Sequence, residues 1–122
     1  MMNLDLTGRR ALVTGASLGI GAAAVRLLAD HGAAVTFCAR NEAAVSELAA
    51  YQPESGSGSV TGLVADMADA DSVSGLLDAV AQAGTTDILV NNVGASPSRN
   101  FLYMTDQDWF DLFELNLMSA VR

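Results

Sequence analysis

The sequence has 122 residues, a length typical of one domain and sufficient to enclose a single hydrophobic core. With 51% apolar and 16% charged residues, the composition is that of a globular protein, and no apolar run approaches the length of a membrane span. Fourteen acidic residues against six arginines give a net charge of −8, and one histidine with one cysteine forms no metal-ligand cluster, so neither nucleic-acid binding nor a metal site is expected.

Short apolar runs alternate with helical patterns along the chain, which predicts a parallel α/β sheet. The opening MMNLDLTGRR lacks the apolar segment of a signal peptide, so a cytoplasmic protein is expected. The expected strands are residues 9–15, 34–39, 60–65 and 87–91. The expected helices run from Ile20 to a stop at Gly32, over 41–50 with Asn41 as cap, over 69–84, and onward from Thr105.

Apolar residues recur at helical spacing in three of these helices. In the first they are Ile20, Ala24, Leu27, Leu28 and His31; in the third Val73, Leu76, Leu77 and Val80; in the last Phe110, Phe113, Leu117 and Val121. Thr105 and Asp108 have the spacing of a capping box. Cys38 has no second cysteine with which to form a disulfide, so a buried thiol in a reducing cytosol is expected.

The connections between these elements are short, so right-handed crossovers are expected throughout. Only the loop at 53–59 has low complexity, and it is too short to separate two domains. A dinucleotide-binding version of this pattern has strand order 3-2-1-4, with a ligand crevice beyond the carboxyl ends of strands 1 and 4. Three glycines follow strand 1 and the NNVG segment (91–94) follows strand 4, so both segments are expected at this crevice.

Gly15, Gly19 and Gly21 stand between a strand and a helix, where they suit a bound phosphate. Such glycines permit a tight turn, close approach of the backbone and close packing of the helix, while the helix presents unpaired N–H groups to the anion. A Walker-type phosphate loop is excluded because it requires a lysine and the chain contains none. Three turn glycines without a ligand remain the alternative.

The segments TGASLGIG (14–21), NNVG (91–94) and NLMS (116–119) together resemble the motifs of the short-chain dehydrogenase/reductase family. The resemblance runs from about residue 7 to the last residue. It implies a Rossmann-type, doubly wound parallel sheet. It also implies hydride transfer between a nicotinamide cofactor and a small carbonyl or alcohol substrate, in a protein that forms homo-oligomers.

The same resemblance assigns cofactor-binding residues. It places the pyrophosphate on Gly15, Ser17, Leu18, Gly19, Ile20 and Gly21, the adenine beside Asp66 and Met67, and the ribose and nicotinamide beside Asn91, Asn92 and Gly94. Val93 stands where the family has alanine. A helix cap or a solvated loop carboxylate is the alternative interpretation of Asp66.

The end of the second strand bears on the choice between NADP and NAD. An acidic residue about twenty positions after the glycines binds the ribose 2′-hydroxyl of NAD, whereas an arginine suits the 2′-phosphate of NADP. Here the strand ends in CAR, with Arg40 and no acid before Glu42, which favours NADP. The family's second NADP feature, a basic residue before the middle glycine, is replaced by Leu18; a plain surface arginine remains the alternative for Arg40.

For catalysis the resemblance implies a tyrosine, a lysine four residues later, a serine and an asparagine. Only Asn116 of NLMS matches, where it helps to hold a water chain; Tyr51 and Tyr103 cannot form the pair because there is no lysine. The chain is therefore expected to be one cofactor-binding domain over 1–122, truncated before the Tyr-x-x-x-Lys segment, and alone it is expected to bind NADPH weakly or not at all and to be inactive. A non-catalytic nucleotide-binding or subunit-interaction module is the alternative. Trp109 and Phe110 are expected in the core or an interface, and the helix from Asn116 to Arg122 in dimer packing.

Overall fold

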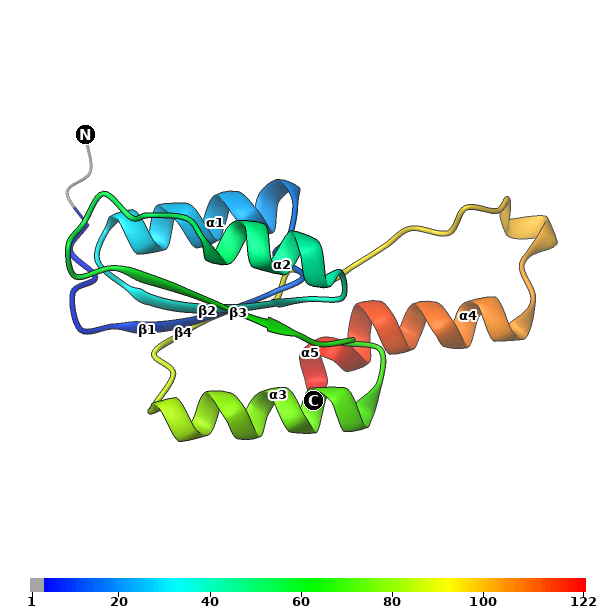
Figure 1. Ribbon diagram of the computed structural model, residues 1–122. Helices are drawn as coiled ribbons and strands as arrows, with labels where there is room; N and C mark the ends of the chain where they lie inside the picture. Colours follow the sequence, from blue (N-terminus) through cyan, green and yellow to red (C-terminus); the bar gives the residue numbers. More distant parts are fainter. Residues whose placement is uncertain (1–3) are drawn as a thin grey trace.

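A parallel sheet with helices on both faces forms the centre of the protein, as seen in the computed structural model, which describes residues 4–122 (Figure 1). Its strands are β1 (Arg10–Thr14), β2 (Ala34–Ala39), β3 (Ser59–Val64) and β4 (Ile88–Val90). Their order, β3-β2-β1-β4, and their parallel pairing confirm the predicted topology. The first three residues of the N-terminal stretch interpreted above lie outside the described residues.

Helices α1 (Gly19–Asp30) and α2 (Glu42–Ala49) cover one face of the sheet, and α3 (Ala70–Ala83) covers the other (Figure 1). The predicted cap of α2 is confirmed, because Asn41 Oδ1 accepts a hydrogen bond from the N–H of Ala44 at 2.9 Å. Helix α3 is capped by Asp69, whose Oδ2 accepts from the N–H of Ser72 at 2.9 Å. Short polar caps thus define where both helices begin; the cap at Asp69 was not predicted, although 69 is where the expected helix starts.

The apolar periodicity located α1 correctly, but its large apolar residues are not the ones that are fully buried. The buried residues are Gly21, Ala22, Val25 and Ala29, whereas Ile20 is 83% exposed and Leu27 is 60% exposed. Small side chains let α1 approach the sheet closely, so the side of the helix with the least apolar volume faces the core. Ile20 and Leu27 are left toward solvent, while Leu28 is partly buried against the core.

The core lies on both faces of the sheet. Between the sheet and the helices α1 and α2, Phe37, Val13 and Val25 are fully buried. On the other face, a second cluster joins the sheet to α3; it consists of Cys38, Ala65, Met67, Val73 and Leu76. The predicted burial of Cys38 is confirmed, and this burial raises the pKa of its thiol, which keeps the sulfur protonated.

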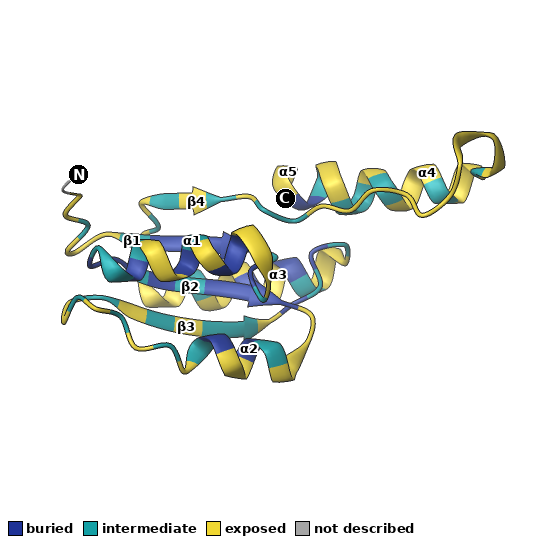
Figure 2. Cartoon of the chain, turned by 90° about the horizontal axis from the view of Figure 1, so that it is seen from above, coloured by how far each residue is buried: buried dark blue, intermediate teal, exposed yellow. Residues whose placement is uncertain are grey.

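Residues 101–122, called the arm below, extend beyond the sheet and are mostly exposed (Figure 2). The arm contains η1 (Phe101–Tyr103), α4 (Asp106–Phe113), a π-helical turn η2 (Glu114–Met118) and α5 (Ser119–Val121). The predicted capping box at Thr105 is confirmed. The apolar stripe of Phe110, Phe113, Leu117 and Val121 is between 52% and 65% exposed, and Trp109 is also exposed. Of the two positions expected for Trp109 and Phe110, the core is therefore excluded and an interface stays a prediction.

No helix within the described range, 4–122, is both long and apolar enough to cross a membrane.

Candidate cofactor site

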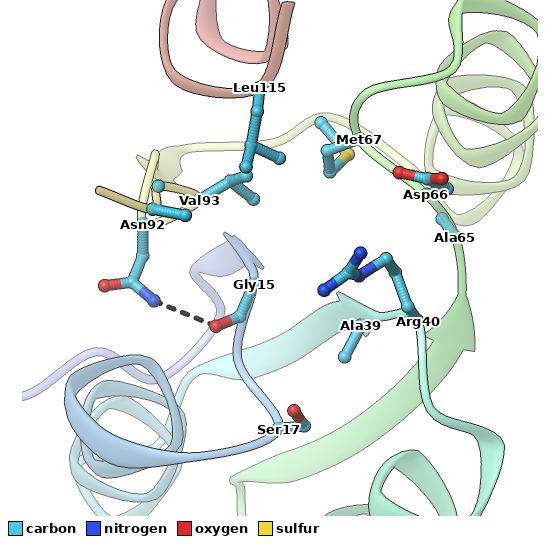
Figure 3. A pocket seen from close by; sticks show the side chains of 12 residues that line it. Gly15, Ser17, Ala39, Arg40, Ala65, Asp66, Met67, Asn92, Val93 and Leu115 are labelled. Atoms are coloured by element: carbon cyan, nitrogen blue, oxygen red, sulfur yellow. Dashed lines mark hydrogen bonds between the residues drawn. The ribbon is translucent and has the colours of Figure 1, made fainter. Parts of the chain in front are cut away.

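A cavity of about 200 Å³ opens at the carboxyl ends of the strands, where the predicted strand order places a ligand crevice (Figure 3). The strand ends are level there, because Thr14 of β1 pairs with Cys38 of β2 and Ala39 of β2 pairs with Val64 of β3. Each strand therefore contributes the residues that follow it. They are Gly15 and Ser17 after β1, Ala39 at the end of β2 with Arg40 after it, Ala65 to Met67 after β3, and Asn92 to Ala95 after β4, with Leu115 of η2 above them.

The glycine turn (residues 15–21) has the backbone geometry of an anion-binding loop. Gly15 and Gly19 have φ angles of +64° and +56°, a left-handed conformation that other residues rarely adopt. A Cβ on Gly19 would meet nothing within 4 Å, so its surface is open to a ligand. Among the described residues no side chain caps α1, so its first N–H groups are available for phosphate oxygens.

Gly21 is needed for close packing against the neighbouring loop. A Cβ there would lie 2.5 Å from Asn92 Nδ2 and 2.8 Å from both Ala16 Cα and the carbonyl oxygen of Gly15. Asn92 occupies this space because its Nδ2 donates a hydrogen bond to the Gly15 carbonyl at 2.9 Å, drawn as the dashed line in Figure 3. The loop after β4 and the glycine turn are thus held together by direct contact.

Thr14 forms a second link between the same two segments. Its side chain is buried, and its Oγ1 accepts a hydrogen bond from the N–H of Asn92 at 3.2 Å while donating to the carbonyl of Val90 at 3.5 Å. Sequence reasoning did not select Thr14 as a site residue. The signal was present, since a hydroxyl side chain at the end of an apolar strand needs a polar partner when it is buried.

Arg40 and Asp66 bring opposite charges to the cavity. The Arg40 guanidinium points into the cavity (Figure 3), and within the described chain it makes no ion pair, whereas Arg9, Arg99 and Arg122 each pair with a carboxylate. Asp66 Oδ1 accepts from the N–H of Ala68 at 3.0 Å. The interpretation of Asp66 as a helix cap is wrong, because Asp69 caps α3; Asp66 is a loop carboxylate at the cavity wall.

The structure brings most of the predicted cofactor residues to the cavity, but not all of them. Its lining includes Gly15, Ser17, Arg40, Asp66, Met67, Asn92 and Gly94. Leu18, Gly19, Ile20 and Gly21 belong to the adjoining turn and do not line the cavity, with Leu18 77% exposed. Asn91 lies instead at a separate hollow of about 330 Å³ beside α3 and α5, since successive residues of an extended segment point to opposite sides. Sequence reasoning missed the lining residues Ala39, Ala65, Ala95 and Leu115, which carry no polar signal.

The Asn116 side chain is linked to the cavity by hydrogen bonds to the backbone of the loop after β4. Its Oδ1 accepts from the N–H of Ala95 at 2.9 Å, and its Nδ2 donates to the carbonyls of Ala95 and Leu112, both at 3.0 Å. Both amide hydrogens are therefore engaged by the protein itself. Asn116 lies in the π-helical turn η2, a feature common at functional sites. Its catalytic role stays a prediction.

The described residues contain no group of three or more His, Cys, Asp and Glu side chains that could hold a metal ion. Among the residues that line the cavity, Arg40 carries the positive charge and Asp66 carries the negative charge. With a net charge of −8 on the chain, an anionic ligand at this site depends on backbone N–H groups and on Arg40.

Comparison with known proteins gives consistent matches. A sequence model described as short chain dehydrogenase matches residues 9–122. The uncharacterized oxidoreductase YvrD of Bacillus subtilis is 38% identical over 121 residues, which cover 99% of this chain and 45% of that protein. The 3-oxoacyl-[acyl-carrier-protein] reductase FabG of Escherichia coli is 37% identical, over 98% of this chain and 48% of its own.

Solved structures agree with the sequence matches. L-sorbose reductase from Gluconobacter frateurii, complexed with NADPH and L-sorbose, superposes with a TM-score of 0.90 at 31% identity, covering 98% of this chain and 46% of that one. A putative short-chain alcohol dehydrogenase from Sinorhizobium meliloti 1021 gives a TM-score of 0.85 at 36% identity, covering 96% and 46%. The chain thus spans about half the length of the relatives that it matches.

Proposed function

The chain belongs to the short-chain dehydrogenase family, and from this premise we propose that it is the cofactor-binding half of an NADP-dependent oxidoreductase. The proposed reaction is hydride transfer between the nicotinamide and a small carbonyl or alcohol. The observation that carries the choice of NADP is the Arg40 guanidinium, which points into the cavity beside the glycine turn without a carboxylate partner in the described chain. When bound, the nicotinamide supplies or accepts the hydride.

The residues at the cavity suit a dinucleotide. The uncapped start of α1 and the open surface of Gly19 support a pyrophosphate on the glycine turn. In this proposal Asp66 and Met67 border the adenine, while Asn92 and Gly94 border the ribose and nicotinamide. Asn91 lines the other hollow, so it is not proposed to contact the cofactor. The solved relative with NADPH supports the same cofactor class.

Arg40 is proposed to bind the 2′-phosphate that distinguishes NADP from NAD. A hydrogen-bonded ion pair with a phosphate is among the stronger contacts that a side chain makes, and no acidic residue stands at the end of β2 to favour a 2′-hydroxyl. We expect Arg40→Ala to weaken NADPH binding about tenfold or more and to change NADH binding less than about twofold.

The test measures the dissociation constants of NADPH and NADH by calorimetry for the wild type and for Arg40→Ala. Arg9→Ala is the matched control, because it removes the same charge from an exposed position paired with Asp87, away from the cavity. A larger NADPH loss in the Arg40 variant supports the proposal. If Arg40→Ala leaves the ratio of NADPH to NADH affinity unchanged, Arg40 does not bind the 2′-phosphate.

Residues 1–122 alone are proposed to lack turnover. Activity by the family's route needs a tyrosine whose phenolate is stabilised by a lysine, and this chain has no lysine. Asn116 is the one member of that set that the chain supplies, and its side chain holds the loop at Ala95. Ketone-dependent oxidation of NADPH, measured on a preparation of verified mass, would contradict this part of the proposal.

A non-catalytic nucleotide-binding or subunit-interaction module is the second candidate. It is favoured by the exposed stripe of Phe110, Phe113, Leu117 and Val121, since exposed apolar surface of this kind marks a contact surface. In either case we propose a cytoplasmic homo-oligomer that uses this stripe. The coding DNA downstream of codon 122 discriminates the candidates: an in-frame serine and Tyr-x-x-x-Lys favour the enzyme, and a stop codon favours the module.

A further inference from the structure

Val93 occupies the space between the glycine turn and the core cluster on the α3 face. Its Cγ2 lies 3.0 Å, and its Cα 3.2 Å, from the point where a Cβ on Gly15 would stand. The same side chain packs, partly buried, against the cluster that contains Cys38, Met67 and Val73. Val93 therefore touches both the turn and the interior, and it also lines the cavity (Figure 3).

The glycine turn is held from two sides. Asn92 is bound to it by the 2.9 Å hydrogen bond from Nδ2 to the Gly15 carbonyl, and Val93 lies so close to Gly15 that a Cβ there would be 3.0 Å from Val93 Cγ2. The loop after β4 is itself held in place, because both the N–H and the carbonyl of Ala95 form hydrogen bonds with the Asn116 side chain. A β-branched side chain has few rotamers, so Val93 is a stiff spacer at this point.

We propose that Val93 is a positioning residue for the dinucleotide: it fixes the glycine turn against the loop after β4 and so sets where the turn's N–H groups meet the phosphates. This inference rests on the proposed function. Alanine, which the family motif has at this position, would leave the space of two methyl groups between Gly15 and the cluster. It would keep the close approach of the Val93 Cα and the Asn92 carbonyl to Gly15 but lose the approach of Val93 Cγ2.

The experiment compares Val93→Ala with two other variants of the same chain. Val80→Ala is the matched control, since Val80 packs on the same cluster but does not line the cavity. Val93→Ile is the rescue variant, because it keeps both branches at Cβ and its extra methyl can enter the adjoining cavity.

The first readout is amide hydrogen exchange at Ala16 of the glycine turn. Its N–H donates a hydrogen bond to the carbonyl of Cys38 in β2 at 3.0 Å. Rates are referred to the amide of Val35 in β2, so that a global loss of stability cancels. We expect Val93→Ala to accelerate Ala16 exchange about tenfold, while Val80→Ala and Val93→Ile leave it within about twofold of the wild type. Equal Ala16 rates in the wild type and Val93→Ala would overturn the inference, whatever the protein binds.

The second readout is the dissociation constant of NADPH. We expect Val93→Ala to raise it about fivefold without changing the ratio of NADPH to NADH affinity, which Arg40→Ala does change. Faster exchange with unchanged NADPH affinity would overturn the positioning of the dinucleotide. Faster exchange in a protein that binds neither cofactor would support the spacer role of Val93 and overturn the proposed function, so the two failures are distinguishable.

Discussion

The glycine turn and the arm differ in what holds their apolar side chains. Around the turn, Val13, Ala16 and Val25 are fully enclosed, and polar contacts from Thr14 and Asn92 complete the packing. In the arm, Phe101, Leu102 and Tyr103 are between 70% and 80% exposed (Figure 2). The geometry of the turn is therefore set by contacts within this chain, whereas the arm presents a surface suited to contact with another one.

The two regions meet at Asn116. Through Ala95 this side chain fixes the loop that in turn packs on Gly15. A Cβ on Gly94 would lie 2.9 Å from Asn116 Oδ1, so the loop has little free space on the arm side as well. Substitutions in the turn and in the arm test whether the stability of one region depends on the other.

The largest effect is expected for Gly21→Ala, which tests how closely the glycine turn is packed. The added Cβ meets Asn92 Nδ2 at 2.5 Å and backbone atoms at 2.8 Å, so we expect about 3 kcal/mol lower free energy of unfolding, measured with urea. Gly75→Ala is the control in exposed space on α3, where removing a helical glycine should stabilise by about 0.5–1 kcal/mol. Similar free energies for the two variants would show that the turn is not closely packed.

A smaller loss is expected for Thr14→Val, which keeps the shape of the side chain but leaves the N–H of Asn92 without its hydrogen-bond partner. An unpaired, partly buried donor costs about 1–2 kcal/mol in unfolding free energy. Thr61→Val on the exposed side of β3 controls for the change of residue type. If the two threonine variants lose equal stability, the link between β1 and the loop after β4 is unimportant.

The smallest effect is expected in the arm and depends on pH. Hydrogen bonds from Thr105, the backbone N–H first and the hydroxyl second, hold the pKa of Asp108 below its usual value, with a further contribution from Arg99. A carboxylate with a lowered pKa stabilises the folded state above the pKa of the unfolded chain, and this stabilisation is lost as the pH falls through the folded-state value. Helix α4 should therefore lose order below about pH 4 while the sheet is retained.

Thr105→Ala supplies the comparison for this pH effect. It removes the capping box, so α4 should be less ordered even at neutral pH, by about 1 kcal/mol, and should show a weaker acid transition. Amide exchange of Trp109 and Phe110, read against Val35, separates the arm from the sheet. An acid transition of equal size in both proteins would exclude Asp108 as its cause.

Sequence patterns predicted the sheet well because strand type and order depend on apolar runs, short connections and handedness. The third strand, expected at 60–65, is observed at Ser59–Val64. The buried residues of α1 did not follow from the sequence, since the periodicity of large apolar residues carries no information on how closely a helix packs. At the site, Arg40 was found from its place at the end of the second strand, and Asn92 from the resemblance of NNVG to a family motif. The orientation of Asn91 and the bonds of Asn116 depend on tertiary contacts, which the sequence does not show.

The central claim is that the glycine turn and Arg40 together bind NADP, and a residue-resolved NMR titration of the 122-residue protein with NADPH tests it most directly. The account predicts saturable amide shifts at the glycine turn, Arg40 and Asp66, with the residues of α4 unchanged. Repeating the titration with NADH should reproduce the shifts at the turn and remove those at Arg40. Saturable shifts confined to the arm, with the glycine turn and Arg40 unchanged, would contradict the account.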